Sequence, residues 1–534
     1  MPQYRMTPIR LAVESLESRD CPAGYGMIDL LPPVGATFSK GVGLNDNGVV
    51  AGFVAGTGPN RATVWQTGTA STATPVLLGA PAGWTAAFAA DVNNASAVAG
   101  QSNQDATGIG RAILWVQSGS NWIYSDLGTL GASFPSSSAN GLSERDAGNV
   151  TWVVGESVTA DAVTHAAVWR VDTAGAVLSR IDLEPGLSMD STAFDARVIG
   201  NMVYVAGEVS ITGGSMARRW ILDLNGNVIS RTDLGTLGGS TSGAAAINGQ
   251  GDVIGSSRPS NSPFYGYFYS NGSMTSVGSL GNYGSRAYGV NDSDIVVGSY
   301  FNLNNRTQQI TNNAFVWQAG VMTDLKTQIV GTKAWSYTYV AIDVNASGSI
   351  VGSGRVKVGK TSEEHGYLAR PVSALQTTEP STGYSRTLSM DAVNSLGQEA
   401  KRRWQLTGAD TSLLQAITIR IADLPGTTLG VASGNTIWLD TNAAGWGWFV
   451  DKTPRSDAEF LRRSNQGEQG RMDLLSVIMH EMGHVLGFDH HENGVMQETL
   501  APGVRLLPEG MKLINTARDT ADVVFALLQH RKAW

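Results

Sequence analysis

Several features that would narrow the class of this chain are scarce or missing. Cys21 is the single cysteine in 534 residues, which excludes a disulfide within the chain. Charged residues make up 15% of the sequence, the net charge is −8 and no basic block occurs. Binding to nucleic acid is therefore not expected, because phosphate contacts need clustered lysine and arginine. No apolar run reaches about 18 residues, so no transmembrane segment is expected, and the first residues lack the apolar core of an ordinary signal peptide.

Glycine, in contrast, is abundant, and much of it belongs to a repeat in residues 23–372. Each copy has an apolar residue and Asn, a polar turn, then two or three apolar residues and a closing glycine. Residues 44–52 and 344–352 are clear copies, and two copies in the middle are degenerate. The closing glycines are Gly52, Gly100, Gly155, Gly207, Gly255, Gly298 and Gly352. Their average spacing is about 50 residues, which is typical of a repeat architecture.

Each copy also contains a short aromatic strand. The aromatic residues of these strands are Trp65, Trp115, Trp169, Trp220, Tyr267, Phe268, Tyr269, Phe315, Trp317 and Tyr367. Short strands joined by Asn-x-x-Gly turns, at about 50 residues per unit, predict a seven-bladed β-propeller, with a β-solenoid as the alternative. The aromatic residues are expected in the blade cores, and the repeated Asn residues in turns rather than as ligands.

The repeat resembles bacterial extracellular HAF repeats, which are named for a His-Ala-Phe strand. Residues 165–167 (His-Ala-Ala) and 313–315 (Asn-Ala-Phe) are imperfect versions of that strand. The repeat region contains no evident ligand cluster, and the isolated His165 and His365 need no function. A platform for binding or display is expected, and its ligand, a protein or a glycan, is unknown.

The periodicity changes after a polar stretch at 373–385, which is predicted to be a linker. In the remaining part, 386–534, helical spacing predicts a helix over 390–404, and residues 416–421 and 435–440 are predicted strands. A second helix is predicted over 474–486, capped by Asp473. An amphipathic helix is predicted over 510–532, and His530 is expected at the surface.

The helix at 474–486 leads into a cluster of four of the seven histidines. His480 and His484 lie one turn apart on one helix face, a spacing that allows both to bind one zinc ion. Glu481 would lie beside the metal, where a general base belongs. Gly487 allows the chain to reverse and bring His490 to the metal as third ligand. His491 is an alternative third ligand, and Asp489 is a weaker one.

The full spacing, H-E-x-x-H-x-x-G-x-x-H followed by Met496 in a tight turn, resembles the metzincin zinc endopeptidases. Residues 445–451 (Gly-Trp-Gly-Trp-Phe-Val-Asp) resemble a stretch before the zinc helix in a bacterial matrixin-like group of that family. The resemblance extends over about residues 390–507. It implies an α+β peptidase domain with one catalytic Zn²⁺, an apolar floor at Met496 and a protein or peptide substrate. It also implies that an edge strand upstream of the zinc helix pairs with substrate, for which residues 435–440 are the candidate. Asp451, Asp457 and Glu459 could bind a structural Ca²⁺, or could simply be solvated acids.

The N-terminal segment is residues 1–22, and residues 10–23 resemble a short N-terminal segment found on large extracytoplasmic proteins of certain bacteria. That resemblance implies an extracellular or envelope location, while a disordered amphipathic tail is the alternative. The sequence therefore predicts a multidomain, secreted or surface zinc endopeptidase with a propeller. The competing hypothesis is a non-catalytic envelope binding protein with a structural or inactive zinc site, in which His491 could be the fourth ligand.

Overall fold

The computed structural model describes residues 24–511 except for short gaps. The gaps are 57, 68–71, 85, 105–108, 120, 132–135, 261, 331–333, 373, 378–387, 425–426, 434, 462–464, 489 and 492. Among the described helices, none combines the length and the apolar character that crossing a membrane requires. The N-terminal segment 1–22 and nearly all of the predicted helix at 510–532, with His530, lie outside the described residues.

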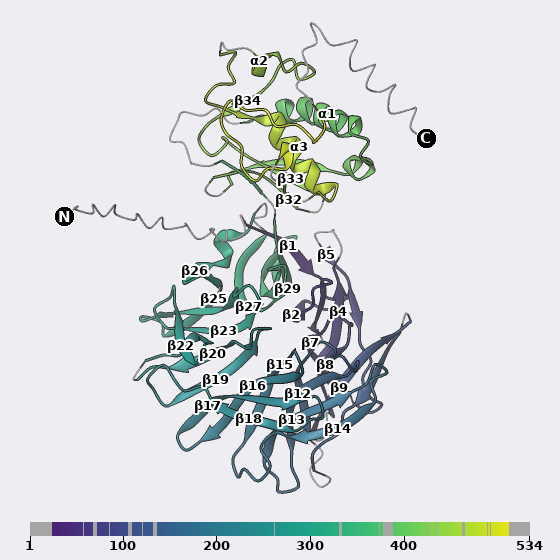
Figure 1. Ribbon diagram of the computed structural model, residues 1–534, viewed down its shortest axis with the longest axis vertical. Coiled ribbons are helices and arrows are strands. Elements are labelled where there is room, and N and C mark those ends of the chain that lie inside the picture. Colours follow the sequence, from purple (N-terminus) through teal and green to yellow (C-terminus); the bar gives the residue numbers. More distant parts are fainter. Residues whose placement is uncertain are drawn as a thin grey trace, which may run out of the picture.

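Most of the described chain forms antiparallel units of four strands, which fan out around a common centre (Figure 1). The first three units are β2 (Phe38–Leu44), β3 (Val49–Ala55), β4 (Arg61–Gln66) and β6 (Pro75–Leu77); β7 (Ala86–Val92), β8 (Val98–Gln104), β9 (Ile109–Ser118) and β10 (Asn121–Asp126); and β11 (Ser137–Leu142), β12 (Thr151–Val158), β13 (Thr164–Val171) and β14 (Val177–Asp182). The next three are β15 (Ser191–Ile199), β16 (Met202–Ile211), β17 (Gly214–Asp223) and β18 (Val228–Asp233); β19 (Thr241–Ile247), β20 (Val253–Arg258), β21 (Tyr265–Ser270) and β22 (Ser273–Gly278); and β23 (Ser285–Val290), β24 (Val296–Asn304), β25 (Gln309–Gln318) and β26 (Val321–Asp324). The last unit is β27 (Trp335–Val344), β28 (Ile350–Val358), β29 (Thr361–Pro371) and β1 (Tyr25–Leu30).

The units close into a ring. In each unit the second strand contacts the first strand of the next unit, and β28 of the last unit contacts β2 of the first. The strand that precedes the first unit, β1, pairs antiparallel with β29, from Tyr25 opposite Pro371 to Leu30 opposite Gly366. The chain thus closes the ring by giving its first described strand to the last unit. This arrangement is a seven-bladed β-propeller, as the repeat predicted, and not a solenoid with two open ends.

The closing glycine of each repeat lies opposite a β-bulge in the innermost strand of its blade. In the second blade the register shifts between Ala89 and Asp91, and a Cβ added to Gly100 would overlap the backbone oxygen of Phe88. The same bulge and the same close approach to a backbone oxygen recur in the other six blades. A bulge bends the strand and brings its backbone close to its partner, so only glycine fits there.

The repeated Asn residues hold the turns and also join neighbouring blades. Asn345 Oδ1 accepts the backbone N–H of Ser349, and its Nδ2 donates to Asn45 O in the next blade. Asn45 in turn donates to Asn93 O. Eight of the ten repeated aromatic residues are buried in the blades, as predicted, while Phe268 and Trp317 are half-buried. The Asn prediction and the aromatic prediction are both confirmed.

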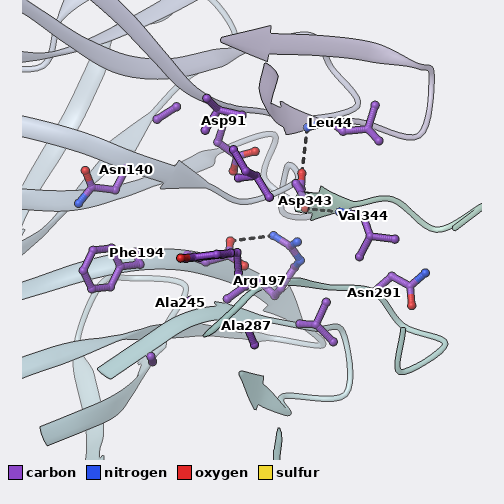
Figure 2. A pocket seen from close by; sticks show the side chains of 18 of the residues that line it. Leu44, Asp91, Asn140, Phe194, Arg197, Ala245, Ala287, Asn291, Asp343 and Val344 are labelled. Carbon is purple, nitrogen blue, oxygen red and sulfur yellow. Dashed lines mark hydrogen bonds and ion pairs between the residues drawn. The ribbon is translucent and has the colours of Figure 1, made fainter. Parts of the chain in front are cut away.

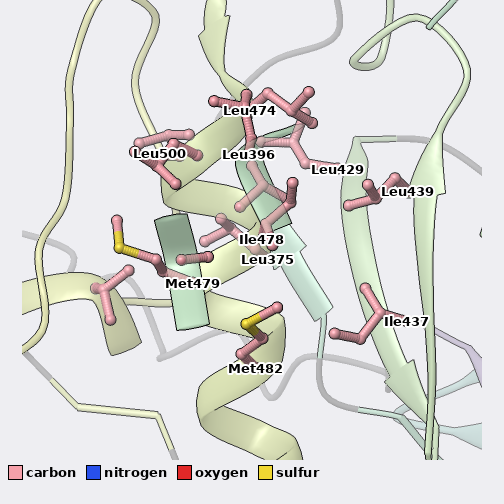
Figure 3. Packing of buried hydrophobic residues seen from close by; sticks show 14 of the residues in the cluster. Leu375, Leu396, Leu429, Ile437, Leu439, Leu474, Ile478, Met479, Met482 and Leu500 are labelled. Atoms are coloured by element: carbon pink, nitrogen blue, oxygen red, sulfur yellow. The ribbon is translucent and has the colours of Figure 1, made fainter. Parts of the chain in front are cut away.

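The C-terminal part is a small sheet covered by two helices, drawn in green and yellow in Figure 1. Its elements are β30 (Ala374–Gln376), α1 (Met390–Leu406), β31 (Thr418–Ala422), β32 (Thr428–Ser433), β33 (Thr436–Asp440), β34 (Trp448–Phe449), α2 (Ala458–Leu461), β35 (Met472–Asp473) and α3 (Leu474–Val485), with 3-10 turns at Ser412–Gln415 and Gly494–Met496. The sheet order is β30-β32-β33-β31. Figure 3 shows the buried core in which α3 packs between the sheet and α1, with Leu396, Ile437 and Ile478 among its residues.

Two predictions about this part need correction. The strand at 435–440 was expected at an edge, free to pair with substrate, but β33 lies between β32 and β31 and is paired on both sides. The sequence also failed to predict β32, because its Gly430 and the preceding Pro-Gly made residues 424–430 resemble a loop. Residues 374–376, within the predicted linker, form β30 and pair with β32.

Candidate metal centre

Helix α3 carries the predicted metal ligands and is fixed at both ends. Asp473 is its N-cap, with a side chain that accepts the backbone N–H of Ser476 at 3.1 Å. Beyond its C-terminus, Gly487 has φ +88°, the left-handed conformation expected there. Ten consecutive residues from Leu474 to Gly483 are buried. The cap, the glycine and the burial together hold His480 and His484 in place.

The structure brings His480, His484 and His490 together. The Nε2 atom of His484 lies 2.9 Å from that of His480 and 3.2 Å from that of His490, and the third separation is 3.3 Å. Imidazoles that bind one zinc ion at about 2.0–2.1 Å in tetrahedral geometry hold their nitrogen atoms about 3.4 Å apart. The three side chains therefore fit a single zinc ion.

The other ring nitrogens set which atom faces the centre. His480 Nδ1 donates to Val495 O at 2.7 Å, and His484 Nδ1 donates to Phe488 O at 2.9 Å, because a carbonyl oxygen can only accept. Each bond leaves Nε2 with its lone pair toward the centre, which is the usual arrangement of a metal-binding histidine. Burial, followed by the nearby His484, lowers the pKa of His480 to about 3, so its ring is neutral at physiological pH.

The alternative third ligand, His491, lies elsewhere. Its side chain is exposed, and its Nδ1 accepts the backbone N–H of Asn493 at 3.3 Å. Among the described residues, one cluster of histidine, cysteine or acidic groups could hold a metal, and it consists of His480, His484 and His490. Asp489, the weaker candidate, lies outside the described residues.

Glu481 lies under strand β32 and is fully buried. Its Oε1 accepts the backbone N–H of Leu375 at 3.3 Å. Its Oε2 is buried with no hydrogen-bond partner among the described residues. Burial raises the pKa of Glu481 well above its usual value, while the backbone N–H groups of Leu375 and Ala432 act in the opposite direction. A buried carboxylate oxygen without a partner, one residue from a histidine of the cluster, suits a group that handles a proton.

Met496 is buried in the turn that follows His490. A Cβ added to Gly483 of α3 would overlap Met496 Sδ and come within 2.9 Å of Trp404 Cζ2. The preceding residue, Val495, supplies the oxygen that fixes His480. The turn therefore packs directly on the helix at the level of the histidine cluster, which agrees with the expected apolar floor.

Two of the three acids proposed for calcium, Asp451 and Asp457, are engaged by arginines, while Glu459 accepts a hydrogen bond from Thr453 Oγ1 at 2.8 Å. Arg505 Nη1 donates to Asp451 at 2.8 Å and to Asp457 at 2.7 Å, and its other nitrogens bind both oxygens of Asp473. Arg403 also donates to Asp457, at 2.9 Å. The negative charge that calcium would balance is thus balanced by buried guanidinium groups. The sequence showed these arginines only as charges in helical and loop segments and gave no sign that they were buried.

A central cavity of about 740 Å³ lies within the propeller (Figure 2). Asp91, Asp195 and Asp343 line it, each on a bulge, and each accepts a backbone N–H from the next or an adjacent blade. Arg197 donates to Asp195 at 2.9 Å, and burial raises the pKa of Asp343 to about 6. These acids are therefore occupied in holding the blades together.

The two propeller histidines are also structural. His165 and His365 are buried and pair with Asp182 and Asp29, each on the neighbouring outermost strand of the same blade. This agrees with the expectation that they need no catalytic or metal-binding role.

No protein-family model and no curated protein matches the chain. Solved structures that resemble it include the β-propeller domain of the Trilobed protease from Pyrococcus furiosus, at 9% identity over 65% of this chain and 94% of that one, with a TM-score of 0.38. A puromycin hydrolase mutant complexed with PGG has 12% identity over 63% and 53%, with a TM-score of 0.40. Trypanosoma rangeli sialidase with the inhibitor DANA has 9% identity over 68% and 63%, with a TM-score of 0.33. The chain thus spans less than two thirds of the sialidase, and at these scores the likeness carries no inference about activity.

Proposed function

We propose that the C-terminal part is a zinc-dependent endopeptidase of the metzincin type, carried on the same chain as the β-propeller. The observation that supports it most is the convergence of three Nε2 atoms, together with the neighbouring residue Glu481, whose buried Oε2 has no hydrogen-bond partner among the described residues. Zinc held by His480, His484 and His490 would supply Lewis-acid activation of a peptide carbonyl and of water. Three protein ligands leave a coordination position open, as catalytic sites do.

Glu481 is the proton-transferring group of this proposal. It takes a proton from the attacking water and gives it to the nitrogen of the leaving amine. The position of Glu481 supports this role. Its Oε1 already accepts the backbone N–H of Leu375 in β30, the strand beside β32, and its Oε2 has no partner among the described residues. His480 and His484 keep their orientation through Val495 O and Phe488 O.

The competing proposal is a binding protein with a structural zinc site. A structural zinc takes a fourth protein ligand, and His491, the candidate, is exposed and apart from the cluster in the described chain. The geometry therefore favours the catalytic proposal. The location outside the cell and the ligand of the propeller rest on sequence resemblance alone and stay predictions.

The test compares zinc content and hydrolysis of a mixed fluorogenic peptide library by the zinc-loaded chain and three variants. Glu481→Ala should keep zinc and lose cleavage, and His491→Ala, the matched control, should keep both. His490→Ala should lose zinc and cleavage together. Turnover by Glu481→Ala would contradict the assigned role, and loss of zinc from His491→Ala would favour the structural site.

A further inference from the structure

Strand β30 lies where the propeller joins the C-terminal part. β29 ends at Pro371 and β30 begins at Ala374, so two residues separate the last blade from this strand. β30 pairs antiparallel with β32, with Ala374 opposite Val431 and Leu375 opposite Gly430. β32 would otherwise present a free edge, and an open edge beside a catalytic group is where a peptide adds as an extra strand.

The other side of β30 is bound as well. Gln376 donates its backbone N–H to Glu498 O at 3.0 Å, and Leu500 donates to Gln376 O at 2.9 Å. The extended segment therefore lies between β32 and the stretch that follows the turn at Met496. We call the space between β32 and residues 498–500 the groove. Residues 374–376 are held there by backbone hydrogen bonds on both sides, as a bound peptide would be, and such binding depends little on the peptide's side chains.

One side chain anchors the segment. Leu375 is fully buried and belongs to the same apolar cluster as Met479 of α3 and Leu500 (Figure 3). α3 carries His480 and His484, so this side chain is buried against the helix of two of the proposed zinc ligands.

A peptide bond of this segment lies beside the proposed catalytic group. The backbone nitrogen of Leu375 is 3.3 Å from Glu481 Oε1. That nitrogen belongs to the Ala374–Leu375 peptide bond, and it is the atom that must receive a proton when such a bond is hydrolysed. The next residue after His480 therefore contacts the nitrogen of a bond in the chain itself.

We propose that residues 374–376 occupy the groove as an intramolecular substrate and that the chain cuts itself between Ala374 and Leu375; this inference rests on the proposed function. The oxygen of one water molecule adds to the carbonyl carbon of Ala374, and the C–N bond to Leu375 breaks. One proton of the water passes through Glu481 to the nitrogen of Leu375. The second proton of the water is released to solvent when the new carboxyl group ionises, so the products are a propeller that ends in the carboxylate of Ala374 and a peptidase that begins with the amine of Leu375. Until the cut, the segment excludes other peptides from β32.

The test begins with the full chain purified with a chelator, then loaded with zinc. Intact mass and N-terminal sequencing should show a new fragment that begins at Leu375. The rate constant for formation of this fragment should not change on dilution, because a bound segment of the same chain reacts in a unimolecular step. Glu481→Ala should stay intact with equal zinc. A cut at another bond, or a rate proportional to concentration, would overturn the inference.

Two further measurements separate this inference from the proposed function. In Leu375→Arg the new side chain cannot be buried, so the peptide bond at 374–375 is no longer held in place. Self-cleavage should then be at least about 100-fold slower, because misplaced reacting groups react slowly. The same variant should cleave foreign peptides without delay. If wild type cleaves foreign peptides and stays intact at 374–375, the self-cleavage inference fails and the peptidase stands. If only Leu375→Arg cleaves them, the segment is an inhibitor and not a substrate. If neither protein cleaves any peptide, the proposed function fails and the inference falls with it.

A third measurement does not depend on activity. In zinc-free Glu481→Ala, a fluorescent peptide with the sequence of residues 370–379 should bind weakly, because the groove is filled. The double variant Glu481→Ala/Leu375→Arg should bind it at least about tenfold more tightly, since removal of a competing intramolecular segment raises the apparent affinity of a free peptide. Equal binding by the two proteins would show that the segment does not occupy the groove. Circular dichroism of the double variant checks that α1 and α3 are formed.

Discussion

Arg505 is the residue whose removal tests most directly how the zinc helix is held. Its guanidinium group makes hydrogen bonds of 2.7 to 2.9 Å to Asp451, Asp457 and Asp473, and all four side chains are fully buried. In Arg505→Met the apolar stem is kept and the charge is removed. Asp457 keeps Arg403, but Asp451 and Asp473, the N-cap of α3, lose their cation. Breaking a buried ion pair by removing one partner costs about 3–5 kcal/mol, and we expect a loss of that size.

The assay is urea unfolding of the full chain, followed by ellipticity at 222 nm. The helical signal isolates the C-terminal part, because α1, α2 and α3 all lie there. The matched control is Arg402→Met, which removes a partly exposed arginine paired with Glu399 and should cost about 0–1 kcal/mol. Equal, small losses in the two variants would refute the reasoning.

The Arg505→Met penalty should also depend on pH. Burial already raises the pKa of Asp451, and Arg505 opposes that shift. Without Arg505, the folded pKa of Asp451 rises further, so the folded variant binds more protons than the unfolded chain. Stability then falls as pH rises, and the difference from wild type should be larger at pH 8 than at pH 5. An opposite trend would show that another group dominates.

The remaining predictions concern single contacts. Gly483→Ala should reduce zinc content, because the added methyl group overlaps Met496 and approaches Trp404. The further change Met496→Ala should restore part of the zinc content, since Trp404 Cζ2 still lies within 2.9 Å of the added group, and no recovery at all would contradict the packing argument. Burial lowers the pKa of His365, but Asp29 and Glu363 together outweigh burial, so the pKa is raised. The pair should therefore stabilise the propeller below about pH 6.5 and lose that contribution as pH rises through the folded pKa; in Asp29→Asn the urea midpoint should change less over this range. Gly100→Ala should cost about 1–3 kcal/mol in thermal unfolding, since its Cβ meets the backbone oxygen of Phe88, and an unchanged midpoint would contradict the bulge argument.

The propeller was predictable because its period is local. The closing glycines meet the equivalent backbone oxygen in all seven blades, and each blade has a strand with a buried aromatic residue. The Asn turns donate to the next blade at Asn45, Asn93, Asn291 and Asn345. The three histidines were predictable for a similar reason, since a helix and one reversal at Gly487 set their spacing. Patterns of this kind depend on residues that are close together in the sequence, so the sequence alone reveals them.

Other features depend on segments far apart in sequence. β30 and β32 are more than fifty residues apart, and nothing in a polar, Ser- and Thr-containing stretch indicates that three of its residues pair with a strand. β33 lies inside the sheet because β32 pairs with one of its edges. The sequence did not predict β32, because a glycine within it and a Pro-Gly pair before it are typical of a loop. Arg505 has carboxylate partners from 32 to 54 residues away, and charge alone cannot show burial.

Val431 connects the two parts of the molecule. Its backbone lies opposite Ala374 in the groove, and its side chain is buried in a cluster with Val330 and Val372, which come from the propeller side of the junction, and with Leu424. The propeller therefore contacts the back of the strand whose edge holds the intramolecular segment. A cut between Ala374 and Leu375 would break the chain but leave this apolar contact in place. Under the self-cleavage inference, release of the groove and separation of the two parts are thus distinct events, and the second requires Val431 to be exposed to water.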